Sequence, residues 1–401
     1  MRFFQHPNEL NIMKLNKKLP IFLLITTIVI ILSAFSLFSK NITKTQISSQ
    51  DSIQDETSAA FLENDGPYLF VNEDELTATG YWVCQGEVKK DVVPLTNFPI
   101  TLNYCGLPAE IVSANVKEDK TIEYSGDFKV AAVSDFHGQY RLMKSLLQNN
   151  KIIDQQGKWS FADGHLVITG DVFDRGDKVT EILWFLYKLE QQALQAGGQL
   201  HLLLGNHEVM VLNGKLRYLN PKYIEVAKRL NMPFEQLFSK NSILGNWLRS
   251  KPVLVKVNNN LFAHGGFHPS LAEDNHSLEA VNTVFKANLI KAELDQPRQG
   301  WGKYLHKSNG PIWYRGYFKD GDEGANSQEI DSLLKHFDIN HIIVGHTSQK
   351  QIETRYQGRV IAIDSSIKKG EYGEILFIES AKNKDDVIWR GTLDGKKLSL
   401  I

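Results

Sequence analysis

Five short apolar runs between residues 129 and 347 each lead into a polar motif that contains glycine. The motifs are Ser134-Asp135-Phe136-His137-Gly138, Gly170-Asp171-Val172-Phe173-Asp174-Arg175-Gly176, Gly205-Asn206-His207-Glu208, His264-Gly265-Gly266 and Gly345-His346-Thr347. Runs of this length and composition predict buried strands, and α/β sheets carry their chemistry just beyond the carboxyl ends of such strands. The repeated pattern therefore predicts that the five motifs meet at one site.

The stretch from Gly170 to Gly176 is central to this prediction. It brings two carboxylates and an arginine into one tight turn after the apolar run 166–168. We interpret Asp171 as a carboxylate that bridges two metal ions, Arg175 as a ligand of a phosphate oxygen, and Asp174 as the partner of a histidine from another segment. Taken alone, the stretch is equally compatible with an ordinary strand-to-helix loop.

The other motifs supply the remaining metal-ligand candidates. The one-residue gap between Asp135 and His137 lets both side chains project to the same side of an extended turn. One ion is expected to be bound by Asp135, His137 and Asp171, and the other by Asp171, Asn206, His264 and His346. Such mixed oxygen and nitrogen ligand sets suit manganese, iron or zinc, and the sequence does not select among them.

His207 has a different expected role because the side chains of neighbouring residues diverge. It is predicted to point past Asn206 toward a leaving group, and a nearby Asp174 carboxylate would favour its protonated form. Glu208 is expected to fix the loop by hydrogen bonding. Arg315, in the segment Trp313-Tyr314-Arg315-Gly316, is a candidate second phosphate ligand because a guanidinium offers a planar pair of donors.

The charge balance argues against nucleic acid as a partner. Among 401 residues, 45 lysines and arginines face 46 aspartates and glutamates. No global basic field is available to attract a phosphate backbone at long range.

The amino-terminal part differs from the rest. Residues 1–20 carry lysines, and residues 21–38 are almost uninterruptedly apolar, which predicts a membrane helix with a cytoplasmic amino terminus. A cleaved signal peptide ending at Ala34-Phe35-Ser36 competes with this retained anchor. Either way, the catalytic part is expected outside the cytoplasm, in the periplasm. Residues 39–65 are rich in Ser, Thr, Gln and acidic residues and are expected to form a flexible tether.

The remaining chain is predicted to contain two parts. Residues 66–125 form a small β-rich module with strands at 68–71, 80–83, 92–95 and 111–116, and Cys84 and Cys105 within it are either a disulfide or two free thiols. Residues 126–401 form the catalytic domain, with a helical insertion at about 212–250, a hairpin around Asn258-Asn259-Asn260, and strands at 359–363, 374–378 and 387–390 that close a second sheet.

The order of the motifs resembles the calcineurin-like metallophosphoesterases, and more narrowly the phosphoprotein phosphatases. Residues 313–316 and the β-rich front end are similar to the Shewanella-like protein phosphatases. The resemblance implies an α/β fold, a β-sandwich of two mixed sheets flanked by helices, with two metal ions at one edge. It implies the same metal ligands, His207 as general acid paired with Asp174, and Arg175 and Arg315 as phosphate ligands. A hydroxide between the ions would attack phosphorus in line.

The resemblance also ranks the candidate substrate classes. It favours a phosphoprotein, with phosphotyrosine ahead of phosphoserine and phosphothreonine. A scavenging phosphatase of small monoesters, a bisnucleoside polyphosphate hydrolase and a phosphodiesterase are the alternatives. Gly345-His346-Thr347-Ser348 lacks the second histidine of many diesterases. A catalytically dead binding protein is disfavoured because every expected ligand, and His207, is present.

Overall fold

The computed structural model describes residues 63–73, 76–114, 116, 120–379 and 386–401. The expected cytoplasmic segment (1–20), membrane helix (21–38) and nearly all of the tether (39–65) lie outside these residues. Within the described ranges, no helix has the length and apolar character needed to cross a membrane.

One six-stranded mixed sheet carries the first three motifs. Its strand order is β17-β16-β15-β7-β8-β9, with β7, β8 and β9 parallel and the other pairs antiparallel. The strands are β7 (Val130–Val133), β8 (His165–Ile168), β9 (Gln199–Leu202), β15 (Glu374–Glu379), β16 (Val387–Thr392) and β17 (Lys397–Ser399). Helix α2 (Tyr140–Asn149) follows β7 and α3 (Val179–Gln195) follows β8, so each crossover connects parallel neighbours.

A second six-stranded mixed sheet carries the other two motifs. Its order is β13-β14-β12-β11-β10-β6, built from β6 (Glu123–Tyr124), β10 (Leu254–Val257), β11 (Asn260–Ala263), β12 (His341–Val344), β13 (Glu353–Arg355) and β14 (Val360–Ala362). Val257 pairs with Asn260, which confirms the predicted hairpin. The strands expected to close one second sheet are instead divided: β14 lies here, whereas β15 and β16 belong to the first sheet. Sheet membership depends on long-range pairing that local apolar runs do not encode.

The two sheets enclose an apolar layer between them. One buried cluster contains Val130 and Ala132 of β7 together with Phe262 of β11 and Ile343 of β12. The alternate residues of β7, Ala131 and Val133, belong to a second cluster on the other face. Because successive strand side chains point to opposite faces, β7 is buried on both sides. The prediction of two mixed sheets flanked by helices is confirmed.

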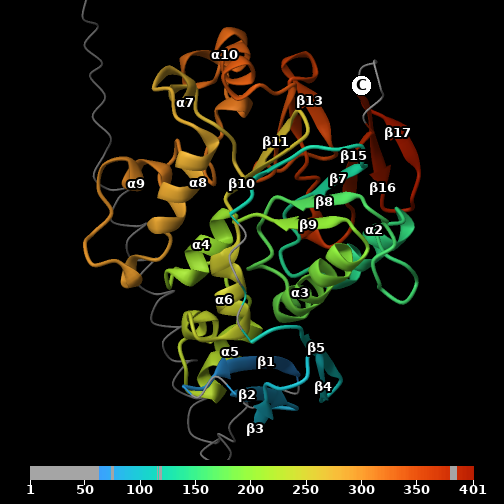
Figure 1. Cartoon of the computed structure of the whole chain (residues 1–401), viewed down its shortest axis with the longest axis vertical. Coiled ribbons are helices and arrows are strands. Elements are labelled where there is room, and N and C mark those ends of the chain that lie inside the picture. The colour runs from blue at the N-terminus through green and yellow to red at the C-terminus, as the bar shows by residue number, and fades with distance from the viewer. Residues whose placement is uncertain (1–62, 74–75, 115, 117–119, 380–385) are drawn as a thin grey trace, which may run out of the picture. The chain divides into compact units, whose positions relative to one another are not determined.

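Helices cover the outer faces and fill the long connections (Figure 1). Helix α4 (Asn206–Leu212) precedes the predicted helical insertion, which contains α5 (Pro221–Leu230), η1 (Phe234–Phe238) and α6 (Ile243–Ser250). The later helices are α7 (Ser270–Glu273), α8 (Leu278–Ala287), η2 (Lys291–Glu293), α9 (Gly300–Leu305), η3 (Gly316–Phe318), η4 (Gly321–Glu323), α10 (Ser327–Phe337), η5 (Tyr356–Gly358) and η6 (Ile367–Lys369). Asn220 caps α5 by accepting from the Lys222 amide, and Asn231 ends it in a left-handed conformation.

The β-rich front segment contains a three-stranded sheet and a hairpin. The sheet has the order β1 (Asp65–Val71), β2 (Thr77–Cys84), β3 (Glu87–Pro94), and the hairpin joins β4 (Ile100–Tyr104) to β5 (Leu107–Ile111). The sequence reading missed β4, and the strand expected at 111–116 is wrong because β5 ends at Ile111. Cys84 and Cys105 form a disulfide with their Cα atoms 5.7 Å apart.

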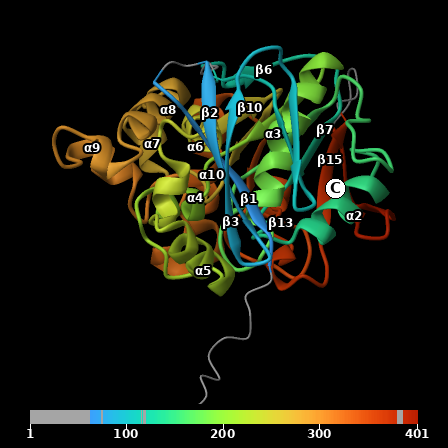
Figure 2. The ribbon, with the colours of Figure 1, turned by 90° about the horizontal axis from the view of Figure 1, so that it is seen from below.

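The front segment shares its core with the catalytic part. Trp82 of β2 belongs to the same buried cluster as Trp184 of α3 and Trp247 of α6, and the Trp184 indole donates to the Pro67 carbonyl at 3.0 Å. Figure 2, viewed from below, shows the three strands lying across these helices. Strand β6, which lies before residue 126, pairs with β10 of the second sheet. Asp65, the last residue of the expected tether, is buried in β1.

Candidate metal centre

The predicted site residues occupy loops with an unusual backbone. Asp135, His137, Asp171, Asp174, Arg175 and His346 all have positive φ, between 45° and 71°. Each lies just after β7, β8 or β12. L-residues rarely adopt this conformation, which costs about 1–3 kcal/mol each and persists only where the surroundings enforce it.

Two of these loops enforce each other's conformation. The amides of Asp135 and His137 donate to the carbonyls of Gly170 and Asp171 at 3.1 and 2.9 Å. A Cβ atom at Gly138 would lie only 2.6 Å from the Gly176 carbonyl carbon, so the close approach requires glycine. The Glu208 carboxylate accepts from the amides of Asp171 and Val172 at 2.8 and 2.7 Å, which confirms its expected role in fixing the loop.

The first expected ligand group, Asp135, His137 and Asp171, is assembled and buried. His137 Nε2 lies 3.7 Å from Asp135 Oδ1 and 3.5 Å from Asp171 Oδ2. His137 Nδ1 lies 2.7 Å from the Phe173 carbonyl and must donate its proton there. Nε2 therefore keeps a free lone pair directed at the carboxylates, as a metal ligand requires. Burial lowers the pKa of His137 to about 3, which keeps the ring neutral.

The second expected group also converges around Asp171. His264 Nε2 lies 3.2 Å from Asp171 Oδ2, 2.9 Å from Asn206 Oδ1 and 3.1 Å from His346 Nδ1. Its Nδ1 donates to the Thr169 carbonyl at 2.9 Å, the same arrangement as in His137.

The charges of the two groups fit bound cations. Burial, followed by the charge of Asp364, raises the pKa of Asp135 to about 8. Burial opposes a charged His264 ring, yet the Asp171 charge raises the pKa of His264 to about 9. The cluster thus attracts positive charge. His137, Asp171 and His207 have ligand atoms within 4.8 Å of one another, as do Asp171, His264 and His346, so Asp171 belongs to both sets. Oxygen and imidazole donors of this kind suit manganese, iron or zinc.

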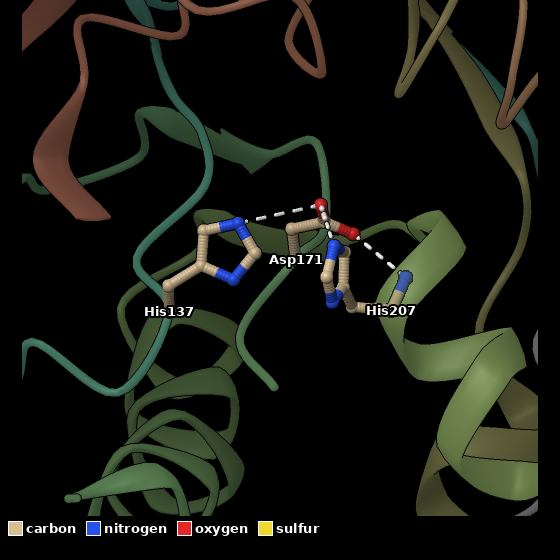
Figure 3. Close-up of side chains that lie close together, drawn as sticks. All are labelled: His137, Asp171 and His207. Carbon is tan, nitrogen blue, oxygen red and sulfur yellow. Dashed lines mark hydrogen bonds and ion pairs between the residues drawn. The ribbon is translucent and has the colours of Figure 1, made fainter. Parts of the chain in front are cut away.

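His207 has a hydrogen-bond partner unlike those of His137 and His264. Its Nδ1 lies 2.5 Å from Asp174 Oδ2, a carboxylate rather than a carbonyl, and its Nε2 lies 3.7 Å from Asp171 Oδ2. Figure 3 shows Asp171 between the rings of His137 and His207. Burial opposes a charged His207 ring, but the carboxylates of Asp171 and Asp174 outweigh it and raise its pKa. The arrangement favours a proton-carrying ring over a fourth ligand imidazole.

Two arginines lie at the rim of the buried cluster. The Arg175 amide donates to the Tyr218 carbonyl at 3.1 Å, and its guanidinium lies 5.2 Å from the centre of the Tyr218 ring. Arg315 Nη1 donates to Thr347 Oγ1 at 3.0 Å, beside the ligand candidate His346. Both guanidinium groups are exposed and can reach an anion above the carboxylates.

Three residues of the site were given no role on the basis of the sequence. Tyr218 lies with its ring centre 5.3 Å from that of His207, Thr347 orients Arg315, and buried Asp364 accepts from Ser348 Oγ at 2.5 Å. Asp364 could have been found, because Asp364-Ser365-Ser366 follows an apolar strand as the other motifs do. Tyr218 carries no such signal, since its position depends on how the chain turns after α4.

Comparisons with known proteins agree with this geometry. The calcineurin-like phosphoesterase family matches residues 128–350. The chain is similar to the crystal structure of the cold-active protein-tyrosine phosphatase of a psychrophilic Shewanella species, with 39% identity, a TM-score of 0.77, and coverage of 84% of this chain and 100% of that one.

Two curated relatives are more distant in sequence. Shewanella-like protein phosphatase 1 of Plasmodium berghei is 29% identical over 57% of this chain and 63% of its own length. The chain therefore spans less than two thirds of that relative. Shewanella-like protein phosphatase 2 of Arabidopsis thaliana is 24% identical over 60% of this chain and 72% of its own length.

Proposed function

The chain belongs to the calcineurin-like phosphoesterase family, and from this we propose that it is a two-metal protein phosphatase that prefers phosphotyrosine. The observation that carries the proposal is the position of the Asp171 carboxylate, whose Oδ2 lies 3.5 Å from His137 Nε2 and 3.2 Å from His264 Nε2. A carboxylate in that position can bridge two ions. Its relatives include proteins named as a protein-tyrosine phosphatase and as protein phosphatases.

Each ion would have its own set of ligands. Asp135, His137 and Asp171 would bind one ion, and Asp171, Asn206, His264 and His346 would bind the other. Ions bound there supply an activated water and neutralise phosphate oxygens. The carbonyls of Phe173 and Thr169 hold the Nδ1–H groups of His137 and His264, so Nε2 of each ring is the atom that would face an ion.

His207 delivers the proton that the leaving group needs. Asp174 holds the Nδ1–H, so the second proton of the charged ring resides on Nε2. When the P–O bond breaks, Nε2–H can protonate the departing oxygen, and the Asp174 carboxylate stabilises the charged ring before that transfer.

Arg175 and Arg315 bind the phosphoryl oxygens. Their forked donors suit two oxygens of one phosphate, and their positive charge stabilises the negative charge that these oxygens carry in the transition state. The backbone bonds of Arg175 and the Thr347 contact of Arg315 limit their freedom before substrate arrives.

Tyr218 supports the preference for phosphotyrosine. It is 39% exposed, although one part of its ring contacts His207 and the Arg175 guanidinium lies over it. An exposed ring beside the general acid can pack against an aromatic leaving group, whereas a serine or threonine side chain is too small to use it.

Hydrolysis assays on the purified protein test the function. We expect turnover of a phosphotyrosine peptide that a chelator abolishes and manganese restores, with slower turnover of matched phosphoserine and phosphothreonine peptides and none of a diester. Faster turnover of the diester would contradict the monoesterase assignment. A bisnucleoside tetraphosphate included in the same series tests the nucleotide alternative.

We also propose that the catalytic domain functions outside the cytoplasm, attached through residues 21–38. The apolar sequence of that segment and the Cys84–Cys105 disulfide support this, because disulfides persist in oxidising compartments. Protease treatment of intact cells, compared with lysed cells, tests the proposal. If the domain resists protease in cells whose outer membrane has been made permeable while the inner membrane remains closed, the proposal is contradicted.

A further inference from the structure

A basic pocket lies apart from the metal centre, between the loop after α4 and the segment that connects α8 to α9. Its volume is about 430 Å³, within the range of small-molecule binding sites. Five cationic side chains and one carboxylate, Asp295, line it. The cationic residues are Lys215, Lys291, Arg298, Lys303 and Lys307. The whole chain has a formal net charge of −1, so this local excess is not a consequence of a basic protein.

The lysines of this basic pocket are not neutralised by acidic neighbours. Lys215, Lys291, Lys303 and Lys307 are exposed, and none forms an ion pair within the described residues. The nearby carboxylate of Glu293 instead binds Arg249 at 2.6 Å. The charge of Lys215 lowers the pKa of Lys291, and Arg298 and Lys307 act in the same direction. A bound anion would relieve this repulsion.

Two further groups of the basic pocket are fixed in place. Arg298 donates through Nε to the Asn288 carbonyl and through Nη2 to the Leu289 carbonyl, both at 2.6 Å. His306 is buried, stacks on Phe285 and donates from Nε2 to the Phe285 carbonyl at 3.1 Å. Its buried Nδ1 has no hydrogen-bond partner among the described residues. Burial, followed by the charge of Arg298, lowers the pKa of His306 to about 3, so the ring is neutral and its Nδ1 can accept a hydrogen bond from a ligand.

Helix α4 connects the basic pocket to the metal centre. The ligand candidate Asn206 begins α4, and Asn213, just after its end, donates to the Leu289 carbonyl at 3.0 Å and accepts from the Lys291 amide at 2.9 Å. Figure 1 shows α4 between β9 and helices α8 and α9. Seven helical residues span about 10 Å, which an extended peptide covers with about three residues. The guanidinium groups of Arg175 and Arg217 lie 5.2 and 4.7 Å from the centre of the Tyr218 ring and add positive charge at the rim of the metal centre.

We propose that the basic pocket binds a second anionic group of the substrate chain, either a phosphate or a cluster of carboxylates, three to five residues from the phosphotyrosine. The proposal rests on the phosphatase function proposed above. Lysine and arginine donors bind both kinds of anion, and the volume exceeds what one small anion fills. Substrates with a single phosphate in a neutral sequence would then bind less well.

Two measurements on the full chain test the proposal. The first is a calorimetric titration with inorganic tripolyphosphate, which measures its affinity for the protein. The second compares kcat/KM for two peptides that share one phosphotyrosine and carry, four residues away, either three glutamates or three glutamines. Each rate is divided by the rate on para-nitrophenyl phosphate, so that differences in the amount of folded enzyme cancel.

Matched double variants separate the basic pocket from general charge effects. Lys291→Gln with Lys303→Gln changes the pocket, whereas Lys240→Gln with Lys335→Gln removes the same charge elsewhere. Lys303 and Lys335 both lie in the last turn of a helix, and Lys240 and Lys335 are exposed. We expect the pocket variant to bind tripolyphosphate about tenfold more weakly, and its ratio of kcat/KM for the glutamate peptide over the glutamine peptide to fall about tenfold. The control variant should keep both values.

The possible results lead to different conclusions. Equal tripolyphosphate binding by the pocket variant and the unchanged protein would overturn the site. Tripolyphosphate binding that depends on the pocket, without any advantage of the acidic peptide, would overturn the assignment to the substrate chain and indicate a free phosphate compound. If no phosphopeptide is hydrolysed while tripolyphosphate still binds at the pocket, the proposed phosphatase function fails and the anion site stands.

Discussion

The metal centre and the front sheet are both buried, but they bury opposite kinds of group. The centre contains carboxylates and imidazoles on loops of positive φ, held by backbone hydrogen bonds. The front sheet buries mainly apolar side chains, among them Leu69, Ala78 and Trp82, on antiparallel strands, and along β2 buried residues alternate with partly exposed ones from Thr77 to Trp82.

This difference indicates where the fold carries function and where it carries stability. Left-handed backbone and clustered charges oppose folding and are retained where a reaction needs them. Buried apolar side chains on unstrained strands favour folding. Substitutions in the centre should therefore change the rate more than the stability, and substitutions in the front sheet should do the reverse.

The largest effect is expected for Asp171→Asn. Asp171 is the one residue in both ligand sets, so the change should weaken both ions and reduce kcat/KM roughly a thousandfold or more. Metal content measured by mass spectrometry should fall together with activity. Near-normal activity with two ions still bound would break the assignment of Asp171 as the shared ligand.

His207→Ala should have the next largest effect, and its size should depend on the leaving group. We expect a loss of about 10²–10⁴-fold on alkyl phosphates and a smaller loss on aryl phosphates, because phenolates leave with less need of a proton. Equal losses on both substrates would contradict the general acid role.

The pH dependence sharpens the test of His207. Asp171 and Asp174 raise its pKa, so the acid form persists below the raised pKa and is lost as the pH rises through it. The alkyl-phosphate rate should therefore fall on the alkaline side. In His207→Ala this alkaline fall should disappear from the rate profile, whereas its persistence would assign the titration to another group.

The centre was predictable from sequence because its information is local. Asp135 and His137, or Asp171 and Asp174, lie within one loop, and each loop follows an apolar run that marks a strand. The loop conformation then follows from a few neighbouring residues, among which Gly138 is required by the approach of Gly176.

The rest depended on contacts between distant segments. Strand β6 pairs with β10, more than a hundred residues later in the chain, and β14 and β15 enter different sheets although both read as short apolar runs. Tyr218 reaches His207 only because the chain turns back after α4. Apolar periodicity indicates which residues are buried. The pairing of distant strands determines which residues they pack against.

In the front sheet, breaking a buried ion pair should reduce stability without a matching loss of rate. Lys222 Nζ lies 3.2 Å from Asp65 Oδ1, and both side chains are buried. Asp65→Asn removes the nearer of the two carboxylates around the buried Lys222 charge and leaves Glu181 at 3.8 Å, and we expect the free energy of unfolding to fall by about 3 kcal/mol. Chemical denaturation measures the change.

An exposed ion pair supplies the control for Asp65→Asn. Lys319 and Glu323 lie 3.1 Å apart at the surface, and Lys319→Met should change the free energy of unfolding by less than about 1 kcal/mol. A loss of kcat in Asp65→Asn larger than twofold, at temperatures where it is folded, would break the division between the two regions.

Removing the disulfide should have a somewhat smaller effect on the same quantity. Cys84 and Cys105 are 21 residues apart in sequence, and a cross-link closing a loop of that size stabilises a fold by about 3 kcal/mol or less. The double variant Cys84→Ser, Cys105→Ser should melt at a lower temperature and keep its kcat on aryl phosphates. A folded but inactive double variant would contradict a mechanism that needs no thiol.

The smallest effect is expected for Tyr218→Leu, at the rim of the centre. The ring contacts His207 and lies under Arg175, but 39% of the residue is exposed to an incoming substrate. Losing an aromatic contact should reduce the ratio of kcat/KM for phosphotyrosine over phosphoserine peptides by about three- to tenfold.

Tyr81→Leu in the front sheet is the matched control, because Tyr81 packs against Phe70 instead of a site residue. An unchanged ratio in Tyr218→Leu would place the preference elsewhere. A changed ratio in Tyr81→Leu would show that the front sheet, too, contributes to substrate choice.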